Sequence, residues 1–327
     1  RGEGRRWPRF RDGAPKILSL SRYADVLHSK ARPKKLSVNL TDGTSDRLLC
    51  KREKDGDLRK DARVNDFNEC VNRLLQQRAD ARARKLRLRT YAVVILDEEC
   101  GLCEWVRDTH GLRYVIEKAY SIQCASAAAA QQSDGKGAAP APKAFVPFYD
   151  ERLQKKFHAV QSDYARDAEA MALAYRRDVA AQYAPCLSRW FERRFGAEPA
   201  AWFEARARFC TSAACWGAVG HVVGLGDRHG ENVLVDVRRG ECVHVDFDCV
   251  FDKGCALRRP EVVPFRLTPH MVEAFGVTGI EGLFRRSLEV VLATAREQPR
   301  VSPSGLAALR PPAQDRTETA PLRTLYG

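Results

Sequence analysis

The amino-acid sequence predicts an α+β fold with two lobes, a small lobe that contains a sheet and a larger, mainly helical lobe. Its 327 residues exceed the roughly 250–300 at which a single hydrophobic core stops growing. Strand signals are concentrated in residues 36–106, whereas helical signals dominate residues 150–223. A block of strands followed by a block of helices is typical of α+β proteins.

The small lobe is expected to begin with a β-hairpin that ends near a lysine. Residues 36–40 alternate apolar and polar side chains, Asp42-Gly43 is a turn signal, and residues 47–51 form the returning strand. Apolar side chains then recur at helical spacing over residues 66–78, so one helical stripe can pack on the hairpin.

A further strand is predicted over residues 91–96, followed by a short apolar connection between the lobes at residues 101–106. The 91–96 segment is also an uninterrupted apolar run, of six residues. Because a membrane span needs about 20 such residues, no transmembrane helix is predicted.

The larger lobe is interrupted by low-complexity sequence. Residues 125–144 are rich in Ala, Gly and Pro and are interpreted as a surface insertion or disordered loop. The domain organisation that we predict is a basic flexible arm at 1–14, an N-terminal lobe at 15–102, a hinge at 103–106, a C-terminal lobe at 107–297 and an irregular tail at 298–327.

The formal net charge of +13 permits a nucleic-acid or membrane partner. We favour a solvated surface, because the arginines are spread along the chain among 42 acidic residues. Eleven cysteines in a chain of this length favour a reducing compartment over a disulfide framework. Cys100 and Cys103 have the local spacing of zinc ligands, but no second pair follows them, and packed thiols explain them better.

The segment GLGDRHGEN at 224–232 carries the features of a phosphoryl-transfer loop. A buried helix over 213–223 should end at the glycines that follow it, which places Asp227 and His229 on a loop. Asn232 lies five residues after Asp227, the separation found between the catalytic Asp and the metal-binding Asn of protein kinases.

Two short strands, 233–237 and 241–246, should form a hairpin directly after this loop. Asp246 then lies at a strand end and Asn232 at the start of the hairpin. Together they offer the hard oxygen ligands that Mg²⁺ prefers.

Each of these residues also has an ordinary structural explanation. Asp227 could cap a turn, His229 could be a satisfied polar residue, and Asp246 could simply end a strand. Their joint occurrence at the right separations around one hairpin favours function over coincidence.

The order Asp-Arg-His in this loop resembles the phosphatidylinositol 3-kinase-related protein kinases, whose loop reads GxGDRHxxN. The resemblance covers roughly residues 17–297. Within that family, ECVHVDFDCVFDKG at 241–254, PEVVPFRLT at 260–268 and EGLFRRSLEV at 281–290 are most similar to the ATR checkpoint kinases. The resemblance implies a bilobed protein-kinase-like (PI3/PI4-kinase catalytic) fold.

The same resemblance implies a role for individual residues. Asp227 resembles the catalytic aspartate, and His229 resembles the residue that supports the developing charge or the acceptor's proton. Asn232 and Asp246 resemble the family's metal ligands, Lys51 its phosphate-contacting lysine, and Asp61 the acidic residue that orients this lysine. Ser29 lies in the segment 28–35, which resembles the phosphate-covering loop, and Trp105 and Val106 resemble the adenine-binding hinge.

Three features depart from related kinases. DFD at 246–248 replaces the DFG of ordinary protein kinases, so a flip of this segment about a glycine is not expected. The 125–144 insertion is longer than the family's usual connection. We also find neither the helical solenoid that precedes the family's kinase region nor its aromatic-rich end, so the sequence resembles a truncated one.

The function predicted from the resemblance is a serine/threonine protein kinase that uses ATP and Mg²⁺, with Mn²⁺ as an alternative ion, and modifies hydroxyls before glutamine. Its implied partners are protein substrates, an accessory subunit and DNA-damage adaptors, without direct DNA or membrane contact, and its implied location is the nucleus. The alternatives are a phosphatidylinositol 3-/4-kinase with the same core and an inactive fragment that only binds partners.

Overall fold

The computed structural model describes residues 15–28, 31–52, 58–97, 99–133, 151–163, 167–178, 180–257 and 260–297. The predicted arm at 1–14, the tail at 298–327 and Ser29 therefore lie outside the described residues. The chain forms two compact units. The first consists of residues up to Arg78, Thr90–Trp105 and residues from Leu292, and the second of Ala79–Arg89 and Val106–Val291.

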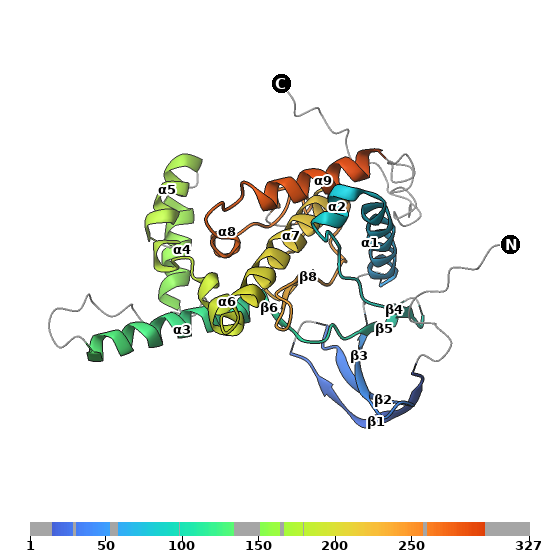
Figure 1. Ribbon diagram of the computed structural model, residues 1–327. Helices are drawn as coiled ribbons and strands as arrows, with labels where there is room; N and C mark the ends of the chain where they lie inside the picture. The colour runs from blue at the N-terminus through green and yellow to red at the C-terminus, as the bar shows by residue number, and fades with distance from the viewer. Residues whose placement is uncertain are drawn as a thin grey trace. The chain divides into compact units, whose positions relative to one another are not determined.

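The first unit contains an antiparallel sheet with the strand order β1-β2-β3-β5-β4 (Figure 1). Its strands are β1 (Ile17–Val26), β2 (Lys34–Leu40), β3 (Ser45–Arg52), β4 (Val93–Ile95) and β5 (Cys100–Glu104). The predicted hairpin is confirmed, because Leu36 of β2 pairs with Leu48 of β3. At its turn, the Asp42 carboxylate accepts a hydrogen bond from the Thr44 N–H at 2.9 Å.

Residues 100–104 form a strand rather than the predicted connection. β5 pairs with both β3 and β4, so long-range pairing decides the conformation of a segment that is short and apolar in sequence. Cys100 and Cys103 are three residues apart on this strand and point to opposite faces, since side chains alternate along a strand. That geometry disfavours a shared zinc ion.

Helix α1 (Arg59–Gln77) begins earlier than the predicted 66–78. Its buried stripe includes Val64, Val71 and Leu75, as the helical spacing requires. Leu58 at its start is 1% exposed and lies over Gly101 of β5, where an added Cβ would be 2.3 Å from the leucine side chain. The absence of a side chain at Gly101 therefore lets the helix approach the sheet.

The second unit is mainly helical and also contains the three-stranded sheet β6-β7-β8 (Figure 1). Its strands are β6 (Thr109–Gly111), β7 (Val233–Asp236) and β8 (Cys242–His244). The α-helices that complete the chain are α2 (Ala79–Ala83), α3 (Leu112–Ser133), α4 (Glu151–Asp163), α5 (Ala168–Asp178), α6 (Leu187–Phe195), α7 (Pro199–Val223), α8 (Pro269–Phe275) and α9 (Leu283–Glu297). Single 3₁₀ turns lie at Ala180–Gln182 and Phe251–Lys253.

Helix α7 is the central helix of this unit. Nearly every residue from Phe209 to Gly220 is buried, because this stretch is apolar or small on all sides. Proline at the first helical position and a left-handed Gly224 after the last one fix its two ends. Phe209 also lies 5.2 Å from Phe191 of α6 and 5.7 Å from Phe275 of α8, measured between ring centroids. This aromatic cluster joins the three helices.

The low-complexity segment differs in part from the prediction. Helix α3 continues through Ser133, so residues 125–133 are helical, and residues 134–144 lie outside the described part. Alanine has the highest helix propensity of all residues, so an alanine-rich stretch can extend a helix that has already formed.

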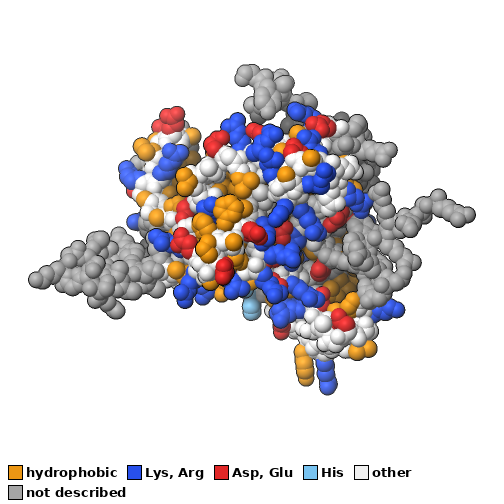
Figure 2. Space-filling view, in the orientation of Figure 1, with side chains coloured by type: hydrophobic (Ala, Val, Ile, Leu, Met, Phe, Trp, Pro, Cys, Tyr) orange, Lys and Arg blue, Asp and Glu red, His pale blue; other side chains and the backbone are white. Residues whose placement is uncertain are grey.

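The described residues contain no helix long and apolar enough to cross a membrane. Figure 2 shows Lys and Arg side chains distributed over the visible face and interspersed with Asp and Glu. Among the ion pairs of the described residues, Lys35 Nζ and Asp25 Oδ2 are 2.9 Å apart.

Candidate active site

The 224–232 loop begins where α7 ends. Gly224 has φ +58° and ψ +46°, a left-handed conformation that closes the helix. A Cβ at this position would be 2.7 Å from the Phe251 carbonyl oxygen, so the loop and the segment after β8 are in close backbone contact. Glycine is required here both by conformation and by space.

Asp227 and Asn232 are fixed to each other across this loop. The Asn232 amide donates from Nδ2 to the Asp227 carbonyl oxygen at 2.9 Å, and the Asn232 N–H donates to the His229 carbonyl at 3.0 Å. Asp227 has φ +54°, an unfavourable region for a residue with a side chain. Its carboxylate is more than half exposed and remains accessible to an acceptor hydroxyl.

The hairpin after the loop has the predicted strands, slightly shortened. Val233 of β7 pairs with His244 of β8, and the Val245 N–H donates to the Asn232 carbonyl at 3.1 Å. Asp246 follows directly, with φ +64°. The hairpin therefore brings the start of β7 and the end of β8, with Asn232 and Asp246, to the same edge of the small sheet.

Arg228 joins the loop to the end of this hairpin. Its side chain is buried, and its guanidinium donates to the carbonyl oxygens of Gly226 at 2.7 Å, Val245 at 2.8 Å and Asp246. Planar donors in a rigid fork suit such a set of acceptors. Arg228 was not among the predicted site residues, although it lies inside the motif, because nothing in the local sequence reveals what it contacts.

His229 is half-exposed and lies beside two carboxylates. Its Nε2 is 4.0 Å from Asp227 Oδ2, and its Nδ1 is 3.2 Å from Glu231 Oε2. The Glu231 N–H also donates to Nδ1 at 3.3 Å. Arg113 of α3 forms an ion pair with Glu231, with Nε and Oε1 2.9 Å apart. The imidazole is therefore oriented with Nε2 toward Asp227.

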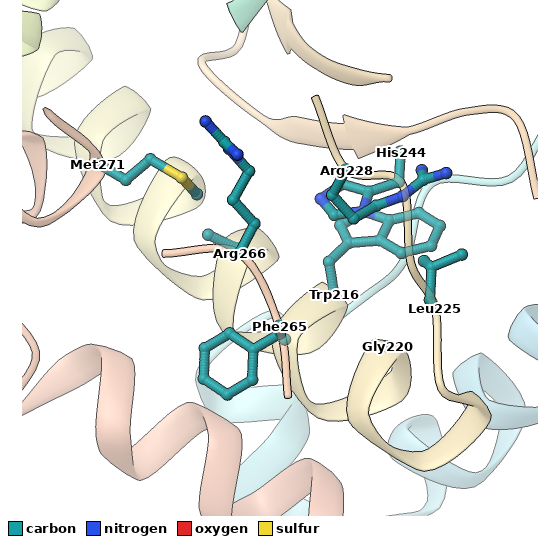
Figure 3. Close-up of a pocket in the computed structure, with 10 residues that line it drawn as sticks. Trp216, Gly220, Leu225, Arg228, His244, Phe265, Arg266 and Met271 are labelled. Carbon is teal, nitrogen blue, oxygen red and sulfur yellow. The ribbon is translucent and has the colours of Figure 1, made fainter. Parts of the chain in front are cut away.

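A small pocket lies behind the loop within the second unit. Figure 3 shows Trp216, His244 and Arg228 together on one side of it, with Arg266 and Met271 across from them. The ring of His244 stacks on Trp216, with centroids 4.7 Å apart and planes inclined by 3°. Burial, and secondarily the charge of Arg228, hold the pKa of His244 well below its usual value of 6.5. The uncharged ring serves as a packing surface under the loop.

The donor set at the hairpin fits a hard divalent cation. The amide nitrogen of Asn232 donates to the Asp227 carbonyl, which leaves the amide oxygen available to a cation, and Asp246 adds a carboxylate. Mg²⁺ is commonly held by one or two such ligands together with water and substrate phosphates, and Mn²⁺ has the same preference for oxygen. Among the described residues there is no cluster of three or more His, Cys, Asp or Glu side chains suited to a metal.

The residues predicted to bind ATP lie mostly in the first unit. Lys51 is on β3 opposite Gly101 of β5, and its side chain is half-buried. Asp61 is buried in the first turn of α1, and its carboxylate accepts a hydrogen bond from the Tyr91 hydroxyl at 2.9 Å. Lys51 and Asp61 thus lie on the sheet and on the helix of this unit, respectively.

Trp105 ends the Thr90–Trp105 part of the first unit, and Val106 begins the Val106–Val291 part of the second. The Trp105 N–H donates to the Arg47 carbonyl at 3.1 Å, and the Lys35 ammonium lies 5.6 Å from the indole centroid. The Val106 carbonyl accepts a hydrogen bond from the Thr109 hydroxyl at 2.8 Å. Both predicted hinge residues are therefore anchored through the backbone.

The sequence matches the family described as phosphatidylinositol 3- and 4-kinase over residues 49–309. It is 42% identical over 282 residues to the serine/threonine-protein kinase ATR of Arabidopsis thaliana. This alignment covers 86% of this chain and 9% of the relative. Protein kinase rad3 of Schizosaccharomyces pombe is 37% identical, with 86% of this chain and 11% of the relative covered. The chain thus spans about a tenth of the length of these curated relatives.

A solved structure, the FAT and kinase domain of CtTel1, superposes with a TM-score of 0.73 and 30% identity, covering 91% of this chain and 19% of that one. Together the comparisons confirm the predicted fold class and the family resemblance of the motifs.

Proposed function

Because this chain belongs to the phosphatidylinositol 3- and 4-kinase family, we propose that it is the catalytic region of an ATR-type serine/threonine protein kinase. The observation that carries this proposal is the fixed geometry of Asp227, His229, Asn232 and Asp246 around one hairpin. The relatives named ATR and rad3 are themselves called protein kinases. Their similarity over most of the chain supports a protein substrate.

Asp227 is the group that receives the acceptor hydroxyl, because its carboxylate is accessible while its backbone is held on the carbonyl side by Asn232. A hydrogen bond to that carboxylate orients the hydroxyl oxygen for attack, and the carboxylate takes up the hydroxyl proton. His229, with Nε2 turned toward Asp227, supports the charge that develops during phosphoryl transfer.

Asn232 and Asp246 would hold Mg²⁺, or Mn²⁺ in its place, when ATP is bound. The bound ion supplies neutralisation of phosphate charge. The chain contributes the rigid placement of the two ligands, since Arg228 and the β7-β8 pairing fix the backbone on both sides. In the same proposal, Lys51 contacts the phosphates and Asp61 orients Lys51. Ser29 is assigned to the phosphate-covering segment, and Trp105 and Val106 are assigned to adenine binding.

Residues 246–264, which begin at the proposed metal ligand Asp246, form the proposed activation segment. Their composition favours a protein over an inositol phosphate as the phosphate acceptor. Lys253 is already engaged by Asp248 through an ion pair. Val262 and Val263 are 90% and 67% exposed and add apolar surface to this segment. A surface of this kind suits a peptide better than a multiply charged headgroup. Hydroxyls before glutamine, an accessory subunit, DNA-damage adaptors and a nuclear site of action belong to the same proposal.

The test is a radiolabelled-ATP assay on the full-length native protein with Mg²⁺, offering a Ser-Gln peptide and phosphatidylinositol vesicles in parallel. The matched control is the Asp227→Asn variant, which keeps shape and hydrogen bonding while removing the proton acceptor. We expect label on the peptide with wild-type protein and none with the variant. Label on lipid alone would establish the lipid-kinase alternative, and label on neither would leave a binding role.

A further inference from the structure

Glu261 reaches the 224–232 loop from a distant part of the chain. It lies 34 residues after Asp227, and both oxygens of its carboxylate accept the Asp227 N–H, at 3.0 and 3.1 Å. The Glu261 N–H in turn donates to the Gly254 carbonyl at 3.1 Å. The side chain thus connects the 246–264 segment to the residue proposed to accept the substrate proton.

The surroundings leave space for this carboxylate. A Cβ at Gly226 would be 2.5 Å from Glu261 Oε2 and 2.8 Å from Cys249 Sγ, and a Cβ at Gly254 would be 3.1 Å from the same oxygen. The Gly226 N–H donates to the Cys249 carbonyl at 2.8 Å, which holds the two backbones in register. Two glycines therefore line the position that the carboxylate occupies.

Asp227 needs support on both sides of its backbone. Its φ of +54° is unfavourable for a residue with a side chain and persists only when neighbouring groups determine it. Asn232 binds the carbonyl side, and the side-chain oxygens of Glu261 bind the N–H side. Releasing the N–H side would allow Asp227 to turn away from the acceptor hydroxyl.

We propose that Glu261 is a positioning residue that holds Asp227 in its reactive orientation and so couples the conformation of the 246–264 segment to catalysis. This inference rests on the proposed kinase function. Glu261 takes no part in the chemistry, and its contribution is geometric. Its length and its acceptor oxygens should therefore matter more than its charge.

Three substitutions in the full-length protein separate these properties. Glu261→Gln keeps length and one acceptor oxygen, Glu261→Asp keeps charge but is one methylene too short, and Glu261→Ala removes both. Glu281→Ala is the matched control, because Glu281 is exposed on the same unit and pairs only with Arg285 among the contacts of the described residues. The measurements are kcat and KM for peptide and for ATP.

We expect kcat to fall about 10- to 100-fold in the Ala and Asp variants, since a displacement of about 1 Å costs up to about a hundredfold in rate. The Gln variant should stay within about threefold of wild type, and KM for ATP should change less than about twofold throughout. Wild-type kcat in both the Ala and Asp variants, or a Gln variant as slow as Ala, would overturn the proposal.

Hydrogen exchange of a peptide containing the Asp227 amide gives a readout that needs no catalysis. The amide should exchange faster in the Asp and Ala variants than in wild type, with protection restored in Gln. Unchanged protection in the Asp and Ala variants would also overturn the inference. A wild-type protein that transfers no phosphate would instead refute the proposed function, so the two failures are distinguishable.

Discussion

The guanidinium of Arg228 binds the main-chain carbonyl of Asp246, eighteen residues further along the chain. The same side chain binds Gly226 and Val245 and lies 5.9 Å from the ring centroid of Phe247. One buried cation therefore fixes the loop that carries Asp227 to the strand end that carries the proposed metal ligand. The relative position of the two functional carboxylates depends on this contact.

Replacing Arg228 with Lys should disrupt that connection while preserving the charge. An ammonium cannot reach three carbonyls in one plane, so at least one buried carbonyl loses its partner. We expect the free energy of unfolding to fall by about 1–3 kcal/mol and kcat to fall at least about tenfold. Denaturant unfolding and steady-state kinetics provide the measurements. Arg285→Lys, at an exposed arginine of α9, is the control and should be neutral.

Gly224→Ala should destabilise the protein more than an alanine at another left-handed glycine. Gly279 has φ +51°, and a Cβ there meets only Val272 at 3.4 Å, so Gly279→Ala should cost about 1–2 kcal/mol from conformation alone. At Gly224 the added Cβ also meets the Phe251 carbonyl at 2.7 Å, and the cost should be larger by at least about 1 kcal/mol. Equal unfolding free energies for the two variants would show that the close approach is unimportant.

His244 should make the protein less stable in mild acid. Its pKa in the folded state is held well below 6.5, mainly by burial, whereas the unfolded chain takes up a proton near 6.5. Below about pH 6.5 the unfolded state therefore binds more protons, and the free energy of unfolding falls as the pH falls. His244→Phe keeps the stack on Trp216 and should flatten this slope.

The control for that measurement is His158→Phe, at an exposed histidine of α4. It should leave the dependence of stability on pH as it is in the wild-type protein. An unchanged slope in the His244 variant between about pH 5 and 6.5 would contradict the assigned role of burial.

The sequence was sufficient where the signal is local. The alternation at residues 36–40 and the turn at Asp42-Gly43 predicted the β2-β3 hairpin, and the glycines after residue 223 predicted the end of α7. The strand signals at 233–237 and 241–246 predicted a hairpin directly after the 224–232 loop, which the structure contains. In each case the conformation is decided by residues within a few positions of one another.

Elements that depend on distant partners were not predictable in this way. Strand β1 is exposed along its whole length and pairs with β2 through register shifts, so it carries no regular alternation. The conformation of β5 is decided by its pairing with β3 on one side and β4 on the other. The contacts of Arg228 and Glu261 span 18 and 34 residues, and no spacing rule connects these positions in advance.

We propose that this hairpin holds a catalytic divalent cation. This claim is tested most directly by ATP turnover of Asp246→Asn as a function of Mg²⁺ concentration in the full-length protein. The substitution is nearly isosteric, so the thermal unfolding midpoint should match that of wild type. Turnover at saturating Mg²⁺ should fall at least about a hundredfold, because the carboxylate that holds the ion is lost. Turnover and Mg²⁺ dependence equal to those of wild type would contradict the claim.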